Sequence, residues 1–561
     1  MSNWKVALLC LFAGSLLSCG GGGGGGSVEE EEEADPPEVS LGERLFLETR
    51  FAQAYFAARG ANVNAPGVGD PVMDATVTTA APLSGPFRGE SMNCRACHLV
   101  DELGDVSGGG VRTYADFGRR SPVPLREDGL LMTARNSPPL VNATLPRSGG
   151  FLLHFDGEFP STADLVRGTF TGRNFGWLPN EEAQAVAHIA NVIRGDDGRG
   201  RLAQDFGGLP YRVVLKGTER SIPADFVLPP QFRIDPETAT DAQVLDAVAN
   251  LVGVYVESLV FQQDPSGVFF ASPYDTFLRK NGLPRAPRPG ESPAVYSSRL
   301  RVLVNGLQQP RFVTPANGAL KLHAQEFAFG EAELAGLKIF LAAPDAVPPS
   351  SAVLQQGGVG NCVSCHPAPD FTDFGLHNTG AAQDEYDAIH GAGAFAALAI
   401  PGIEERNAMP DEFLPPSPAP PFAKGRFRAV PSADHPGETD LGVWNILGNR
   451  DIPAPQLTLE QLLCSVAGTH PAECTTASLL PMTVALFKTP GLRDLGQSAP
   501  YLHTGQEDTL EAVVDFYIRA SALARAGALR NAAPELSGVA LTGDDVTPLA
   551  AFLRALNEDY D

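Results

Sequence analysis

Two short motifs of cysteine and histidine carry the most specific chemistry of this sequence. Both read Cys-x-x-Cys-His, and their residues are Cys94, Cys97 and His98 in the first copy and Cys362, Cys365 and His366 in the second. This spacing is the attachment motif of c-type haem, whose iron is bound by the histidine. A redox dithiol or half of a zinc site is the alternative for a single copy. Two copies that both end in histidine favour two covalently bound c-type haems, with His98 and His366 as proximal iron ligands.

The N-terminal residues predict export and a lipid anchor. Residues 6–17 form an apolar run of signal-peptide length, and the segment that ends at Cys19 resembles the lipobox of bacterial lipoproteins. Residues 1–18 are therefore the predicted signal peptide and Cys19 the predicted lipidated residue, with an ordinary secretory signal cut nearby as the alternative. Residues 19–39, rich in Gly and Glu, predict a flexible tether. We expect a lipid-anchored protein on the periplasmic side, and Gly20 after the anchor favours the outer membrane.

Charge and the remaining cysteines narrow the classes of function. The formal net charge is -25, which argues against binding to nucleic acid or to anionic lipid. Such a charge fits a soluble protein or one that meets a basic partner. In an oxidising compartment Cys464 and Cys474, the pair outside the haem motifs, predict a structural disulfide.

A helical pattern of apolar residues precedes each haem motif. Leu41, Leu45 and Phe46 show it before the first, and Leu334, Leu337 and Phe340 before the second. A helix, a loop and then Cys-x-x-Cys-His is how a cytochrome c domain begins. We therefore predict a mainly α-helical fold with two cytochrome c-like domains, long irregular insertions and few short strands. The predicted parts are an N-terminal haem domain at 40–265 with an insertion at about 205–240, a Pro-rich linker or insertion at 266–325, and a C-terminal haem domain at 326–561 with an insertion at about 400–485.

Further elements follow from the same periodicity. Residues 241–259 predict an amphipathic helix, and residues 509–524 and 547–556 predict two more. The β-branched run at 211–215 indicates a strand.

Several segments outside the haem motifs carry a family resemblance. They are residues 134–142, 154–157, 255–259, 272–275, 371–373, 377–380, 487–493 and 499–505. In these segments the chain resembles the bacterial di-haem cytochrome c peroxidase family, including its MauG-type branch of protein-oxidising maturases. The resemblance implies that one haem meets peroxide while the other relays electrons. It implies an oxidoreductase that reduces hydrogen peroxide or uses it to oxidise a second substrate. Its partner would be an electron donor such as a small cytochrome c, or a protein substrate.

For the second haem, the resemblance implies a far-side ligand on the helix at 509–524. The peroxidases usually carry Met there, whereas the corresponding residue here is Tyr517, as in the MauG-type branch. A phenolate favours oxidised iron, so this haem would be a poor high-potential electron store. A core position on an amphipathic helix is the alternative for Tyr517. The resemblance also implies that His503 and His377 contact haem propionates.

For the first haem, the chain departs from the family at the residues that handle protons. The family segment Trp-Asp-Gly-Arg is here Phe155-Asp156-Gly157-Glu158, and the positions of the catalytic Gln and Glu carry Leu165 and Phe175. Neither replacement can transfer a proton. Nearby candidates for the catalytic role are Asp164, Arg173, Glu181 and Glu182. Trp177 is the candidate for the electron bridge in place of the missing Trp, with a core aromatic as the alternative.

The resemblance leaves a metal site and two other functions open. Asn136, Ser498 and Pro500 match positions where the family holds a calcium ion, and turn-forming residues are the alternative. An apolar far side also resembles the bacterial rubber oxygenases, which are haem dioxygenases. A non-enzymatic electron-transfer lipoprotein is the third hypothesis.

Overall fold

The computed structural model describes residues 35–65, 93–94, 97–98, 120–121, 123–147, 150–320, 323–467, 474–495 and 498–558. The predicted signal peptide, Cys19 and most of the predicted tether lie outside the described residues. Among those described, the fold is mainly helical, and one antiparallel sheet pairs β1 (Leu376–His377) with β2 (Phe487–Lys488). The prediction of a mainly helical fold with few short strands is therefore confirmed.

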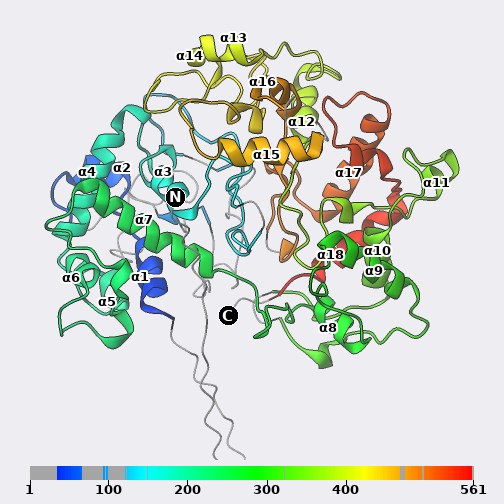
Figure 1. Cartoon of the computed structure of the whole chain (residues 1–561), viewed down its shortest axis with the longest axis horizontal. Helices are drawn as coiled ribbons and strands as arrows, with labels where there is room; N and C mark the ends of the chain where they lie inside the picture. The colour runs from blue at the N-terminus through cyan, green and yellow to red at the C-terminus, as the bar shows by residue number, and fades with distance from the viewer. Residues whose placement is uncertain are drawn as a thin grey trace, which may run out of the picture. The chain divides into compact units, whose positions relative to one another are not determined.

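Figure 1 labels most of the helices along the chain. Before the linker they are α1 (Pro37–Phe46), α2 (Gln53–Arg59), α3 (Thr162–Phe170), α4 (Glu182–Gly195), α5 (Arg201–Asp205), α6 (Tyr211–Lys216) and α7 (Asp241–Ser258). From the linker onward they are α8 (Pro273–Lys280), α9 (Pro293–Asn305), α10 (Glu331–Leu341), α11 (Ser351–Gln356), α12 (Ala381–His390), α13 (Ile403–Ala408), α14 (Pro410–Phe413), α15 (Gln456–Ala467), α16 (Thr476–Leu479), α17 (Leu510–Arg525) and α18 (Val546–Arg554).

The first hydrophobic core forms where α7 packs against α1 and α3. Thr240 and Gln243 cap the start of α7 reciprocally, which satisfies backbone N–H groups that the first turn leaves free. Helix α1 approaches α7 so closely that a β-carbon at Gly42 would collide with Leu251 and Tyr255. Cys94 and Cys97 pack against this core, so the α1–α7 pair supports the first haem motif.

The second core repeats this arrangement with α10 and α18. A β-carbon at Gly336 on α10 would collide with the backbone of Pro548 and with Phe552 on α18. Cys362 packs against this core as Cys94 does against the first. Gly42 and Gly336 thus have the same role in the helix before each haem motif. Because glycine has no β-carbon, α1 can pack closely against α7, and α10 against α18.

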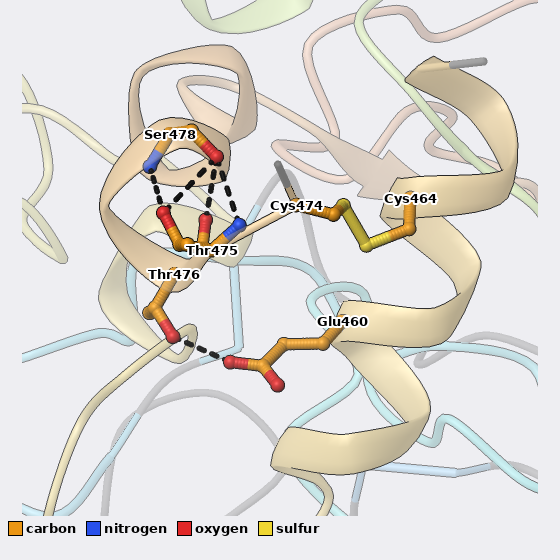
Figure 2. Close-up of a disulfide and its surroundings, with 6 residues drawn as sticks. All are labelled: Glu460, Cys464, Cys474, Thr475, Thr476 and Ser478. Atoms are coloured by element: carbon orange, nitrogen blue, oxygen red, sulfur yellow. Dashed lines mark hydrogen bonds between the residues drawn. A yellow bond between two sulfur atoms is a disulfide. The ribbon is translucent and has the colours of Figure 1, made fainter. Parts of the chain in front are cut away.

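A third core lies largely within the predicted insertion at 400–485. Phe427, Leu441, Trp444 and Leu459 are fully buried in it, together with Leu152 from the first half of the chain. Helix α15 contributes Cys464, which forms a disulfide with Cys474 (Figure 2). The insertion is therefore a packed unit that reaches the first haem region, and the structure contains the predicted disulfide.

Most predicted elements agree with the structure and two do not. The helices predicted at 241–259, 509–524 and 547–556 correspond to α7, α17 and α18. The strand predicted at 211–215 is wrong, because these residues form helix α6 between Pro210 and a left-handed Gly217, with Tyr211, Val214 and Leu215 buried at helical spacing. The predicted tether is too long, since α1 begins at Pro37, where proline suits the first turn. No helix in the described part of the chain is long and apolar enough to cross a membrane.

The predicted domain boundaries stay predictions. Residues 36–561 form one compact unit, in which the three cores are separate clusters of buried side chains.

Candidate haem sites

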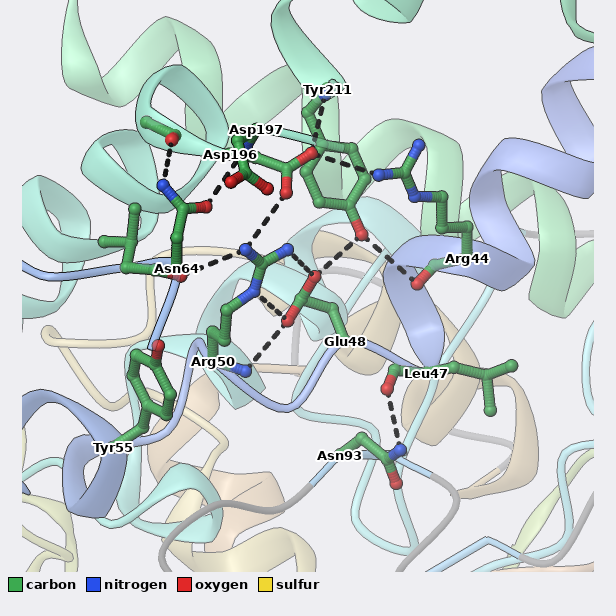
Figure 3. Close-up of polar contacts among 12 residues, drawn as sticks. Arg44, Leu47, Glu48, Arg50, Tyr55, Asn64, Asn93, Asp196, Asp197 and Tyr211 are labelled. Carbon is green, nitrogen blue, oxygen red and sulfur yellow. Dashed lines mark hydrogen bonds and ion pairs between the residues drawn. The ribbon is translucent and has the colours of Figure 1, made fainter. Parts of the chain in front are cut away.

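The first haem motif is held by the segment that follows α1. Asn93, which precedes the motif, donates from Nδ2 to the carbonyl of Leu47 at 2.8 Å (Figure 3). His98 places Nδ1 at 3.0 Å from the carbonyl oxygen of Pro138. A hydrogen bond at Nδ1 fixes the tautomer that leaves Nε2 free to bind a metal. Burial lowers the pKa of His98 to about 4, so the imidazole is neutral, as an iron ligand must be.

The second motif has the same geometry. His366 places Nδ1 at 2.8 Å from the carbonyl oxygen of Phe371, which again leaves Nε2 for iron. Burial lowers the pKa of His366 as well. Two motifs that hold their histidines in the same way support the assignment of both as proximal ligands.

The motif thiols do not have the character of redox-active cysteines. Burial raises the pKa of Cys97 and of Cys362 to about 12, and it also raises the pKa of Cys94 and Cys365. Redox dithiols depend instead on a lowered thiol pKa. These environments disfavour the dithiol alternative, and covalent haem attachment at these thiols stays a prediction.

Tyr517 lies on α17 near the second motif. It packs in a small cluster with buried Phe516, Ala520 and Leu529. Burial raises the pKa of the Tyr517 phenol, and the sulfurs of Cys365 and Cys362 lie close enough to add to the shift. The structure therefore brings Tyr517 and the second haem motif together, as a ligand of that haem requires.

The two predicted propionate contacts occupy different environments. His377 places Nε2 at 2.8 Å from Asp373 Oδ2 and Nδ1 at 3.7 Å from Cys365 Sγ, so it lies beside the second attachment site. His503 is buried and stacks on Phe487 with ring centroids 3.6 Å apart. Its buried Nε2 has no hydrogen-bond partner among the residues that the structure describes, and burial lowers its pKa to about 3. An orphaned buried imidazole nitrogen fits a propionate as its missing partner.

A cavity of about 50 Å³ lies between the loops that follow the two haem motifs. Pro138 lines it from the first loop and Asp370 from the second, with Arg147, Lys488 and Arg493 adding positive charge. Arg493 is already paired with Asp275 and Glu558. Burial and the charge of Arg147 lower the pKa of Lys488 to about 7, and the basic side chains that line the cavity outnumber its one acid, Asp370. Arg147 and Lys488 are thus the residues that would hold haem propionates there.

Two of the three predicted calcium positions touch. Asn136 donates from Nδ2 to the carbonyl of Pro500 at 2.9 Å, and its own Oδ1 accepts from the N–H of Ser137. Ser498, two positions before Pro500 in the sequence, is buried, and its hydroxyl donates to the carbonyl of Asp494 at 2.7 Å. Neutral oxygens suit calcium, but the Asn136 amide would have to rotate to offer one. Calcium at this site stays a prediction.

Three of the four predicted acid–base residues have a structural partner. Glu181 pairs with Arg126 at 2.7 Å, Arg173 pairs with Asp128 at 2.6 Å, Asp164 accepts from Ser161 at 2.6 Å, and Glu182 begins α4. Trp177 is fully buried in the first core and donates to the carbonyl of Phe51 at 3.1 Å. Glu181 and Arg173 lie within electrostatic reach of each other, and the catalytic roles of all these residues stay predictions.

Sequence reasoning missed a cluster of charged residues around Phe155. It joins Arg135, His154, Asp156 and Glu158 to Arg428 and Asp440 of the predicted insertion. Long-range ion pairs leave no local signal in a sequence. The one hint was Glu158, an acid where the family segment has an arginine.

The comparisons with known proteins give short but specific sequence matches. A stretch of 77 residues is 38% identical to cytochrome-c peroxidase IdrP2 of Denitromonas iodatirespirans and covers 14% of this chain and 18% of that protein. A stretch of 33 residues is 61% identical to methylamine utilization protein MauG of Methylorubrum extorquens and covers 6% of this chain and 9% of that protein. These matches confirm the resemblance to the di-haem cytochrome c peroxidase and MauG family. The resemblance implies haem as the cofactor.

The matched stretches span less than a fifth of the length of each curated relative. No protein-family model matches the chain. Solved structures that align with it include the diheme peroxidase BthA of Burkholderia thailandensis, with a TM-score of 0.38 and 17% identity over 94% of this chain and 87% of that one. A MauG-like protein associated with microbial copper homeostasis aligns with a TM-score of 0.39 and 16% identity over 95% of this chain and 92% of that one.

Proposed function

We propose that this chain is a di-haem c-type oxidoreductase that reduces hydrogen peroxide or uses it to oxidise a second substrate. One observation carries the proposal: His98 and His366 each close a Cys-x-x-Cys-His motif and each bind a backbone carbonyl through Nδ1. Both imidazoles are thereby oriented and kept neutral for iron. The sequence similarity to cytochrome-c peroxidases supports the activity.

The two haems would have different tasks. The haem at His98 would meet peroxide, and the haem at His366 would relay electrons to it. The position of Tyr517 beside the second motif supports this division, because Tyr517 as a ligand would keep peroxide from that haem.

Peroxide reduction takes two electrons and two protons and releases two molecules of water. Bound haem would supply the iron at which the O–O bond is reduced. The chain itself would attach both haems through four thioethers, orient their proximal ligands and receive their propionates at His503, Arg147 and Lys488. The electrons would come from a small cytochrome c or from a protein substrate.

We also propose that the protein is periplasmic and lipid-anchored, and the test is whether Cys19 carries a lipid. The lipobox-like segment supports it, as does the disulfide between Cys464 and Cys474, which suits an oxidising compartment. Metabolic labelling with a fatty acid would attach label to the wild type and not to Cys19→Ala. Equal labelling of both would contradict the anchor.

The activity is tested by adding peroxide to the purified protein together with a reduced small cytochrome c. We expect oxidation of the donor at two equivalents per peroxide. Cys94→Ala/Cys97→Ala and Cys362→Ala/Cys365→Ala should each retain one covalent haem and lose this turnover. A protein that ignores peroxide but binds oxygen at an open first haem would favour the dioxygenase. One that binds neither would favour an electron carrier.

A further inference from the structure

Arg428 belongs to the insertion at 400–485. It bridges the carboxylates of Asp156 and Glu158, which lie in the turn at residues 155–158. Its guanidinium pairs with Asp156 and contacts Glu158 Oε2 at 3.0 Å and Oε1 at 3.3 Å. The two carboxylates lie 270 or more positions away from it in sequence. An ion pair between exposed side chains adds little to the free energy of unfolding. Asp156 is fully buried, so leaving its charge unpaired would be costly.

The contacts around this bridge form one network. Arg135 pairs with Asp156 at 2.7 Å and with Asp440 at 2.6 Å, so a second residue of the insertion joins it. Burial opposes ionisation of Glu158, but Arg428 holds its pKa below the usual value. Three carboxylates then face two guanidiniums, and each guanidinium is shared between two acids.

This network borders the first haem site. Phe155 lines the cavity between the haem loops, and its carbonyl accepts from the N–H of Lys488 at 2.6 Å. His154 binds Glu158 through Nδ1 at 3.3 Å. Pro138, whose carbonyl oxygen lies 3.0 Å from His98 Nδ1, lines the same cavity as Phe155. His154 also has a φ of 62°, a left-handed backbone that its neighbours must stabilise.

We propose that Arg428 is a positioning residue of the first haem site. It fixes the turn of Phe155, Asp156 and Glu158 against the haem region by bridging the two carboxylates. The insertion thereby supplies in space the guanidinium that the family segment carries at the position of Glu158. The proposal rests on the proposed haem at His98, but not on which substrate that haem meets.

The geometry calls for arginine and not merely for positive charge. A guanidinium offers donors in a rigid fork and can serve two carboxylates at once, whereas an ammonium is a single point of charge. Removing Arg428 would leave Asp156 with Arg135 alone and Glu158 with His154. The turn would then relax, and the first haem would lose its fixed surroundings.

The test compares Arg428→Gln with a rescue variant, Glu158→Arg/Arg428→Gln, in the di-haem protein. Exposed Arg450, in the same insertion, provides the control Arg450→Gln. Readouts are the electron paramagnetic resonance signals of each ferric haem and the rate at which the first haem changes its absorption with peroxide. We expect Arg428→Gln to shift the first-haem signals alone and to slow the reaction by on the order of ten- to a hundredfold. The rescue variant should recover both, and the control should match the wild type.

First-haem signals that stay unchanged in Arg428→Gln would overturn the proposal, and so would a rescue variant no better than the single one. If Arg428→Gln does not accumulate, Arg428→Lys keeps the charge and loses the fork. It should still shift the first-haem signals, and signals equal to those of the wild type would overturn the proposal. A wild-type protein that ignores peroxide would refute the proposed function, while the resonance signals would still decide the role of Arg428.

Discussion

Arg50 is the side chain whose loss should most weaken the support of the first haem motif. Its guanidinium pairs with Glu48 at 2.7 Å and with Asp196 at 3.0 Å, and these side chains are at most 3% exposed (Figure 3). Tyr211 also donates to Glu48, at 2.9 Å. The neighbouring Leu47 holds Asn93 beside the motif, so disorder in this segment would reach the haem attachment site.

Arg50→Met should lower the free energy of unfolding by about 3–5 kcal/mol, because it leaves the buried carboxylate of Glu48 without its cation, while Asp196 keeps Arg44 at 3.1 Å. For a compact unit of roughly 500 residues this corresponds to a fall of about 3–5 °C in the unfolding midpoint. Urea titrations followed by circular dichroism, with thermal scans alongside, would measure both quantities.

A matched control separates burial from charge. Arg201 and Asp205 form a pair at 3.8 Å with side chains 61% and 60% exposed, so Arg201→Met should cost less than about 1 kcal/mol. If Arg50→Met costs no more than Arg201→Met, the account of the buried network is refuted. Arg50→Met/Glu48→Leu should recover part of the loss, because it also removes the buried charge of Glu48 that Arg50→Met leaves unpaired.

Three further predictions concern the second haem, the insertion and the first core. Tyr517→Phe should change the ferric resonance signals of the second haem and leave those of the first unchanged; identical spectra would exclude Tyr517 as a ligand. Cys464→Ser should lower the free energy of unfolding by about 2–3 kcal/mol, because the disulfide closes a short loop. A reductant should lower the free energy of unfolding of the wild type by the same amount. No loss in either experiment would show that the disulfide is dispensable. Burial lowers the pKa of His188 below 6.5, so below that pH the unfolded chain binds a proton at His188 more readily than the folded chain does. The free energy of unfolding should therefore fall as the pH drops below 6.5. His188→Asn should show a shallower fall, and an equal slope would contradict the lowered pKa of His188.

Local features of the sequence were enough to predict the haem motifs and the amphipathic helices α7, α17 and α18. The Cys-x-x-Cys-His spacing is a covalent requirement, and the apolar periodicity of α7 and α17 is strong and capped by Thr240 and Thr509. Helix α6 was missed because its β-branched pair, Val213 and Val214, favours a strand locally. Tertiary burial of one helical face decided the outcome there.

The environment of the first haem could not be predicted in the same way. Arg428 and Asp156 pair across 272 positions, and nothing near either residue in the sequence indicates the contact. The glycine contacts of α1 and α10 are also tertiary, because they arise only where each helix packs against α7 or α18. The proposed acid–base residues rested on position alone, and the structure gives Glu181, Arg173 and Asp164 another partner.

The central claim is most directly tested by optical and electron paramagnetic resonance spectra of the purified ferric protein, before and after one equivalent of hydrogen peroxide. The account predicts a high-spin first haem that reacts, beside a low-spin second haem whose signals depend on Tyr517. Two low-spin haems that do not respond, even after half-reduction, would contradict the peroxidase-like function and leave an electron carrier.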